Sequence, residues 1–175
     1  MRIVAGRHKG RRLRAPAGAA TRPTADRVRE AVFSIVGPVE GMRVLDLYAG
    51  SGALGLEALS RGAESATFVE SGRPALAAIR ANLEAAGEKA EVVASDAIKW
   101  LRAAADREFD LVFCDPPYDA AAEIAQTLTE LLPRVAAPQA LIVTESSKRN
   151  PLTLDLPLTD ERTYGDTRIA IYRGG

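Results

Sequence analysis

The chain of 175 residues contains a single cysteine, a single histidine and no long apolar run. Because Cys114 has no second cysteine to pair with, an internal disulfide is excluded, and with only His8 beside it we expect no zinc or other structural metal. No stretch approaches the roughly 20 apolar residues of a membrane span. The first residues are too basic for the core of a signal peptide. These absences predict a cytoplasmic protein.

The net charge of zero conceals a strong segregation of charge along the chain. Residues 1–29 carry nine Arg or Lys against one acid, Asp26, which leaves 14 bases and 22 acids from totals of 23 each for the remainder. A basic front on an acidic body is typical of an edge that binds a polyanion. A solvated basic tail without a partner is the alternative.

The remaining pattern predicts one α/β domain. Residues 1–14 alternate apolar and basic around Gly6 and Gly10, which favours a short hairpin. Thr24 can cap a helix that continues to Val36. Strand patterns then occur at 44–48, 66–70, 90–94, 111–114, 140–145, 154–162 and 168–173, and helical patterns at 53–61, 74–86, 96–106 and 120–132. This alternation predicts a doubly wound, mostly parallel sheet with an antiparallel terminal pair, and ligands at the carboxyl ends of its strands. We expect residues 37–175 to form this domain and residues 1–36 a hairpin and helix extension of it.

A glycine-rich turn between the first strand and its helix predicts a nucleotide site. Gly50, Gly52 and Gly55 match the G-x-G-x-x-G spacing, and Glu70 lies at the end of the next strand, where a carboxylate can accept ribose hydroxyls. This much suits NAD as well as S-adenosylmethionine. Asp46, inside the strand, would repel a pyrophosphate and attract the ammonium of a methionine moiety. The alternative for Asp46 is a cap on the following turn.

A second carboxylate follows the third strand of this pattern. Asp96 is placed where it could accept the adenine amino group, and it could equally cap the helix that follows. The two roles are compatible. Together with Asp46, this acid favours S-adenosylmethionine over NAD.

The predicted reaction site is the run Asp115, Pro116, Pro117 and Tyr118, which follows an apolar strand. Consecutive prolines restrict the backbone and remove donors, but their carbonyls remain as acceptors. The Asp115 carboxylate and the Pro116 carbonyl can together hold the two hydrogens of a base NH₂ group, while Tyr118 offers a face for stacking. A rigid turn with a packing tyrosine is the alternative. Cys114 lacks a base to activate it, so we expect a buried apolar side chain.

On these motifs the sequence resembles the RsmD-type methyltransferases, which make N2-methylguanine in the 16S ribosomal RNA of bacteria. The resemblance is carried by residues 2–6, 10–13, 22–24, 26–30, 45–52 and 115–118. The last two segments are shared with many amino-methyltransferases, whereas the basic front with Arg22-Pro23-Thr24 is typical of this family. One departure is His8, which stands where the family often has an aromatic residue.

The resemblance implies a seven-stranded methyltransferase sheet, a monomer, and ribosomal RNA in a partly assembled small subunit as substrate. It implies cofactor contacts at Asp46, Tyr48, Ala49, Gly50, Ser51, Gly52, Glu70, Asp96 and Ala97. It implies RNA contacts at Arg2, Arg7, Lys9, Arg11, Arg12, Arg14, Arg22 and Thr24, with His8 as a further phosphate or backbone contact or a surface bystander. Lys148 and Arg149 are a second candidate RNA surface.

Three other functions remain open from the sequence. A DNA adenine or cytosine amino-methyltransferase would share the same two motifs, but 175 residues leave no room for a separate target-recognition domain. An NAD-dependent oxidoreductase would leave residues 115–118 without a role. A non-catalytic RNA-binding module would not need Asp115 and Tyr118.

Overall fold

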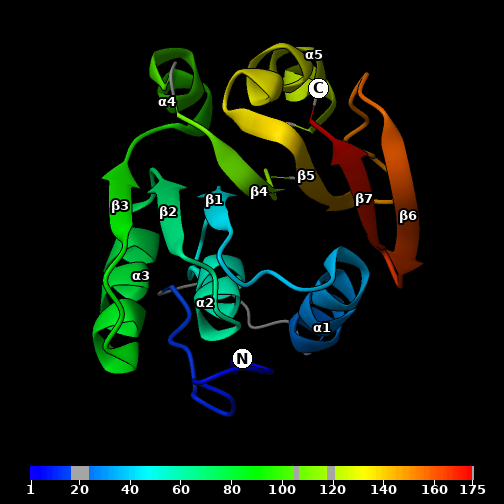
Figure 1. The fold of residues 1–175 in the computed structure, drawn as a ribbon. Helices are drawn as coiled ribbons and strands as arrows, with labels where there is room; N and C mark the ends of the chain where they lie inside the picture. The colour runs from blue at the N-terminus through cyan, green and yellow to red at the C-terminus, as the bar shows by residue number, and fades with distance from the viewer. Residues whose placement is uncertain (17–23, 105–106, 118–120, 175) are drawn as a thin grey trace.

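The computed structural model describes residues 1–16, 24–104, 107–117 and 121–174. Helices and strands alternate along the chain as the sequence predicts (Figure 1). The elements are α1 (Thr24–Val36), β1 (Arg43–Leu47), α2 (Ala53–Ser60), β2 (Ser65–Glu70), α3 (Arg73–Ala86), β3 (Glu91–Ala94), α4 (Ala97–Ala103), β4 (Phe109–Cys114), α5 (Ala121–Leu131), the 3-10 turn η1 (Leu132–Arg134), β5 (Ala136–Ser147), β6 (Leu158–Tyr164) and β7 (Thr167–Arg173).

The seven strands form one sheet in the order β3-β2-β1-β4-β5-β7-β6. Pairing is parallel from β3 through to β5, and β7 is antiparallel to both β5 and β6. The predicted doubly wound, mostly parallel sheet with an antiparallel terminal pair is therefore confirmed. The strand order reverses between β1 and β4, and a reversal of this kind opens a ligand crevice at the carboxyl ends of the strands.

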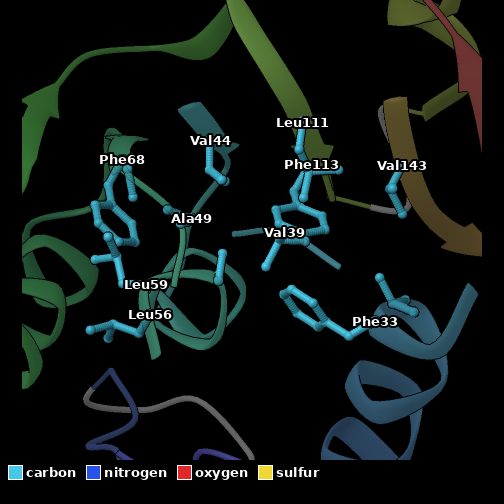
Figure 2. Close-up of a cluster of buried hydrophobic side chains, with 14 of the residues drawn as sticks. Phe33, Val39, Val44, Ala49, Leu56, Leu59, Phe68, Leu111, Phe113 and Val143 are labelled. Carbon is cyan, nitrogen blue, oxygen red and sulfur yellow. The ribbon is translucent and has the colours of Figure 1, made fainter. Parts of the chain in front are cut away.

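Helices cover both faces of the sheet, with α1, α2 and α3 on one side and α4 and α5 on the other (Figure 1). Successive strand residues alternate between the two cores: Val44 packs with α1 and α2, whereas Leu45 packs with α4 and α5. Figure 2 shows the first core, where the rings of Phe33 and Phe113 lie 5.6 Å apart between centroids. In the described part of the chain, no helix is both long enough and apolar enough to cross a membrane.

Three predicted boundaries are wrong. β5 begins at Ala136 instead of residue 140, and β6 begins at Leu158 instead of residue 154. Leu154, which suggests an earlier start of β6, is buried without being in a strand. Its amide donates a hydrogen bond to the Tyr172 hydroxyl at 3.3 Å instead of pairing with a neighbouring strand. Helix α4 ends at Ala103, shorter than the predicted 96–106.

The N-terminal segment (residues 1–16) turns back on itself, as predicted, but without forming a strand ladder. A single antiparallel bridge joins Arg2 and Arg12, and the Ile3 amide donates to the Arg11 carbonyl at 3.0 Å. Ile3 and Leu13 are buried in the same core as α1 and α2. At Gly6 the backbone has φ of 80° and touches the end of α2, where an added Cβ would lie 1.8 Å from the Ser60 carbonyl oxygen. A side chain at residue 6 would therefore push the segment off α2.

Candidate functional site

The parallel register brings the predicted site turns together at one edge of the sheet. Leu47 at the end of β1 pairs with Val69 of β2 on one side and with Cys114 of β4 on the other. Glu70, the last residue of β2, pairs with Ala94 of β3. The glycine-rich turn, Glu70, the turn at Asp96 and the Asp-Pro-Pro turn therefore leave the sheet from four neighbouring strand ends, as the sequence predicts for a single site.

The glycine-rich turn is tightly wound and packs closely on the sheet. Tyr48, Gly50 and Gly52 have φ of 57°, 56° and 75°, and Gly52 caps the start of α2. An added Cβ on Gly55 would lie 2.4 Å from the Phe68 ring, so glycine is required there for α2 to approach β2. Tyr48 is unusual because bulky residues rarely adopt positive φ, and such positions concentrate at functional sites. Burial, with the nearby Cys114 and Asp96 adding to it, raises the pKa of the Tyr48 phenol, so it stays protonated.

Asp46 is 2% exposed and accepts a hydrogen bond from the Gly55 amide at 2.9 Å. Burial raises the pKa of this carboxyl to about 7; the Gly55 hydrogen bond opposes the shift and the charge of Glu70 adds to it. In this geometry Asp46 caps the first turn of α2 from inside β1, which is the structural role that the sequence left open. A ligand ammonium beside it would favour the charged form and remains compatible with the cap.

Glu70 organises the backbone at the end of β2. One carboxylate oxygen accepts from the Gly50 amide at 2.9 Å, and the other accepts from Ser71 and Gly72 at 2.8 Å and 2.7 Å. Asp96 is exposed and caps α4, accepting from the Lys99 amide at 2.8 Å. Both predicted cofactor acids thus lie at the site edge with backbone contacts that hold their orientation.

The Asp-Pro-Pro turn begins directly after Cys114, the last residue of β4. Asp115 is half-buried, Pro116 is buried and Pro117 is exposed, whereas Tyr118 lies outside the described residues. Asp115 takes part in an interaction within the protein and is not free. Burial, reinforced by the charges of Asp115 and Asp46, raises the pKa of the Cys114 thiol, which rules it out as a thiolate nucleophile at neutral pH.

The predicted RNA-contact residues divide into two groups. Arg7 and His8 both contact the Glu88 carboxylate, at 2.7 Å and 2.5 Å, and Arg11 donates to the Ala85 carbonyl at the end of α3. The second group is exposed, and no side-chain hydrogen bond or ion pair of its members is seen among the described residues: Arg2, Lys9, Arg12 and Arg14. Arg22 and the side chain of Thr24 lie outside the described residues.

A buried carboxylate that the sequence analysis missed anchors the N-terminal segment. Glu57 of α2 is 0% exposed and accepts from the Val4 and Ala5 amides at 2.7 Å and 2.9 Å. Its charge is balanced by Arg61 at 2.8 Å and by Arg29 of α1 at 3.4 Å. In the sequence, Glu57 is distinguished only as the one charged residue of an otherwise largely apolar helix.

Asn82 of α3 is a second missed residue. It is 1% exposed and forms hydrogen bonds with both the N-terminal segment and the glycine-rich turn.

At the other candidate RNA surface, the Lys148 ammonium lies 3.2 Å from the Asp166 carboxylate on an exposed loop. Among the described residues no group of three His, Cys, Asp or Glu is arranged to hold a metal ion.

Comparison with known proteins gives one consistent result. A family model described as conserved hypothetical protein 95 matches residues 1–173. The chain is 43% identical over 186 residues to Bacillus subtilis YlbH, named as a candidate rRNA methyltransferase, covering 99% of this chain and 98% of YlbH. It is 41% identical over 180 residues to the ribosomal RNA small subunit methyltransferase D of Escherichia coli, covering 99% and 89%. The solved structure of E. coli yhhF, a candidate methyltransferase, matches with a TM-score of 0.83 at 35% identity, covering 99% and 97%.

Proposed function

The chain belongs to the family described as conserved hypothetical protein 95, and we propose that it transfers a methyl group from S-adenosylmethionine to the exocyclic N2 amine of a guanine in 16S ribosomal RNA. The observation that carries this proposal is the pairing of Leu47 with Cys114, which sets the glycine-rich turn directly beside the Asp-Pro-Pro turn. A methyl donor on the first turn and a base amine on the second would then meet at one point. The name of the E. coli relative supports small-subunit ribosomal RNA as the substrate.

The acids at the site edge suit the three polar parts of S-adenosylmethionine. Asp46 would pair with the ammonium, Glu70 would accept the ribose hydroxyls, and Asp96 would accept the adenine amino group. The backbone of Tyr48, Ala49, Gly50, Ser51, Gly52 and Ala97 would line the same ligand. A dinucleotide fits less well, because its pyrophosphate would face the carboxylate of Asp46.

S-adenosylmethionine supplies a sulfonium methyl group that is already activated, so the protein mainly has to position the amine. The Asp115 carboxylate and the Pro116 carbonyl accept the two hydrogens of the guanine amine, which directs its nitrogen lone pair at the methyl carbon. The N–C bond forms as the C–S bond breaks, leaving S-adenosylhomocysteine. The surplus proton of the amine leaves to Asp115 or to water. Tyr118 and Pro117 border the base, with the tyrosine stacking on it.

The exposed cations of the N-terminal segment would contact the RNA backbone, and residues 1–36 act as an extension of the methyltransferase domain. The target base must leave its stack to reach Asp115, which costs least in a loop or an incompletely folded region. We therefore propose that the reaction takes place on a partly assembled small subunit. We also propose that it takes place in the cytoplasm and that the enzyme acts as a monomer.

The test is methyl transfer with a labelled donor. The full chain is incubated with labelled S-adenosylmethionine and small ribosomal particles that lack the modification, and the RNA is digested to nucleosides. Labelled N2-methylguanosine is the expected product. Label in adenosine or cytidine would show that the target base is adenine or cytosine instead of guanine. If DNA is added to the same reaction and only the DNA is labelled, the protein is an amino-methyltransferase that acts on DNA. An absence of transfer with bound S-adenosylmethionine would overturn the proposal.

A further inference from the structure

Asn82 on α3 contacts two separate parts of the molecule with one buried amide. Its side-chain carbonyl accepts from the Arg14 amide at 2.8 Å, while its NH₂ donates to the Arg14 carbonyl at 3.0 Å. The same NH₂ donates to the carbonyl of Ser51 at 3.0 Å. Both amide hydrogens and the amide oxygen are therefore used. No other side chain of this size supplies one acceptor and two donors.

The two partners belong to different functional regions. Ser51 lies inside the glycine-rich turn, between Gly50 and Gly52. Arg14 lies near the end of the N-terminal segment, where the predicted RNA contacts are concentrated. A second contact joins the same regions, since the Ser51 hydroxyl lies 3.7 Å from the Met1 sulfur. The glycine-rich turn is thus held by Glu70 through the Gly50 amide and by Asn82 through the Ser51 carbonyl.

These contacts link the order of the two regions energetically. If the segment lifts away, Asn82 loses both of its partners on Arg14, the amide that donates to its oxygen and the carbonyl that accepts from its NH₂ group. A buried amide that loses these partners destabilises the undocked arrangement, so the docked segment and the ordered turn favour each other. Such coupling is reciprocal, so a ligand that orders the turn also favours the docked segment.

We infer that Asn82 is a positioning residue that couples the N-terminal segment to the cofactor turn, so that binding of the methyl donor and docking of the RNA-contacting segment reinforce each other. This inference rests on the proposed function, because it takes the glycine-rich turn as the cofactor site. Asn82 acts through the main chain of Arg14 and Ser51, and its own side chain is buried beneath them.

The first test uses the unmodified chain and S-adenosylhomocysteine as the probe, with amide hydrogen exchange followed by NMR. The reporters are Ile3 and Leu13, whose amides bond within the segment to Arg11 and Met1. Saturating ligand should slow their exchange about fivefold or more. If the ligand protects Gly50 and Gly52 but leaves Ile3 and Leu13 within twofold, the coupling is overturned and the proposed function stands. A failure of the ligand to bind overturns the proposed function itself.

The second test replaces the amide by a side chain of similar volume, Asn82→Leu. Loss of the hydrogen bond to Ser51 should weaken S-adenosylhomocysteine binding about tenfold and abolish the ligand-dependent protection of Ile3 and Leu13. Leu128→Ala is the matched control, because it opens a cavity in the opposite core, between α5 and the sheet. It should lower stability yet keep the affinity within twofold and keep the remote protection. If both variants lose the ligand-dependent protection of Ile3 and Leu13 to the same extent, Asn82 contributes only to stability and the proposed coupling is wrong. The first test decides the question alone if Asn82→Leu does not fold.

Discussion

The carboxylate of Glu70 accepts a hydrogen bond from the Gly50 amide at 2.9 Å, and this bond ties the turn after β1 to the end of β2. The second carboxylate oxygen is held by the amides of Ser71 and Gly72. Glu70 is therefore oriented by three backbone donors before any ligand arrives. A side chain oriented in this way binds a ligand without a further cost in conformational entropy.

Two substitutions at Glu70 should separate its structural and ligand-binding roles. Glu70→Gln loses the charge that binds the ribose hydroxyls and keeps only one of the two oxygen acceptors, because its NH₂ group cannot accept from a backbone amide, so we expect at least about tenfold weaker binding of S-adenosylhomocysteine. Glu70→Ala also frees the turn and should weaken binding further. Isothermal titration calorimetry measures both. Affinities within twofold of the unmodified chain would remove Glu70 from the cofactor site.

Asp46 should make stability depend on pH. Its pKa is raised by burial to about 7 in the folded protein, against 3.8 for the ordinary group, so the folded state holds a proton that the unfolded state has released. The stabilisation is complete below about pH 4 and is lost as pH rises toward 7. Asp46→Asn stays neutral and keeps an acceptor for the Gly55 amide. The melting temperature of the variant should therefore rise relative to that of the unmodified chain between pH 5 and pH 8. A constant difference across that range would show that Asp46 does not titrate there.

Removal of the Asp115 carboxylate should affect the reaction and spare the cofactor. In Asp115→Ala the guanine amine loses one of its two acceptors, so we expect kcat to fall by at least about 100-fold. Binding of S-adenosylhomocysteine should stay within a few-fold, because the cofactor contacts lie on β1, β2 and β3. Single-turnover methyl transfer on small ribosomal particles measures the first quantity. Near-normal turnover would exclude Asp115 from the mechanism.

The fold and the position of the site could be predicted because their signals are local in sequence. The apolar strand before Asp115 and the glycines after Asp46 each fall within a dozen residues, and parallel pairing then fixes which turns are neighbours. The predicted start of β6 is too early because Leu154 is buried by packing outside any strand. Apolar alternation alone cannot distinguish the two cases.

The docking of the N-terminal segment could not be predicted. Glu57 bonds residues more than 50 positions away, and Asn82 bonds Arg14 across 68 positions. A polar residue on a helix is solvent-facing in most proteins, so neither side chain stands out without the tertiary structure. Other long-range contacts changed the prediction for the basic front, because Glu88 and the end of α3 give Arg7 and Arg11 partners on the protein.

The last prediction concerns which cations of the N-terminal segment bind RNA. Arg2 and Arg12 lie opposite each other in the bridge, so their side chains project to the same side. Arg14, like Arg12, is exposed next to the buried Leu13. Arg7 and Arg11 instead contact Glu88 and the end of α3. Two double variants remove the same charge: Arg12→Gln with Arg14→Gln, and Arg7→Gln with Arg11→Gln.

If Arg12 and Arg14 each neutralise one phosphate, the first double variant should lower the log–log salt slope of RNA binding by about 1.5 units. The second should change the slope by less than about half a unit, because its arginines contact the protein, and should instead speed hydrogen exchange within the segment. Binding of a 16S ribosomal RNA fragment, titrated from low to high salt, gives both slopes. The first pair should not alter binding of S-adenosylhomocysteine, since Asn82 holds Arg14 by its main chain and the Gln variants keep that backbone. The second pair loosens the segment and should therefore weaken that binding through Asn82. A larger slope change in the second variant would mean that RNA draws Arg7 and Arg11 away from α3. The phosphate contacts would then lie at the tip of the segment, around Lys9, and the contact with Glu88 would be one that RNA has to break.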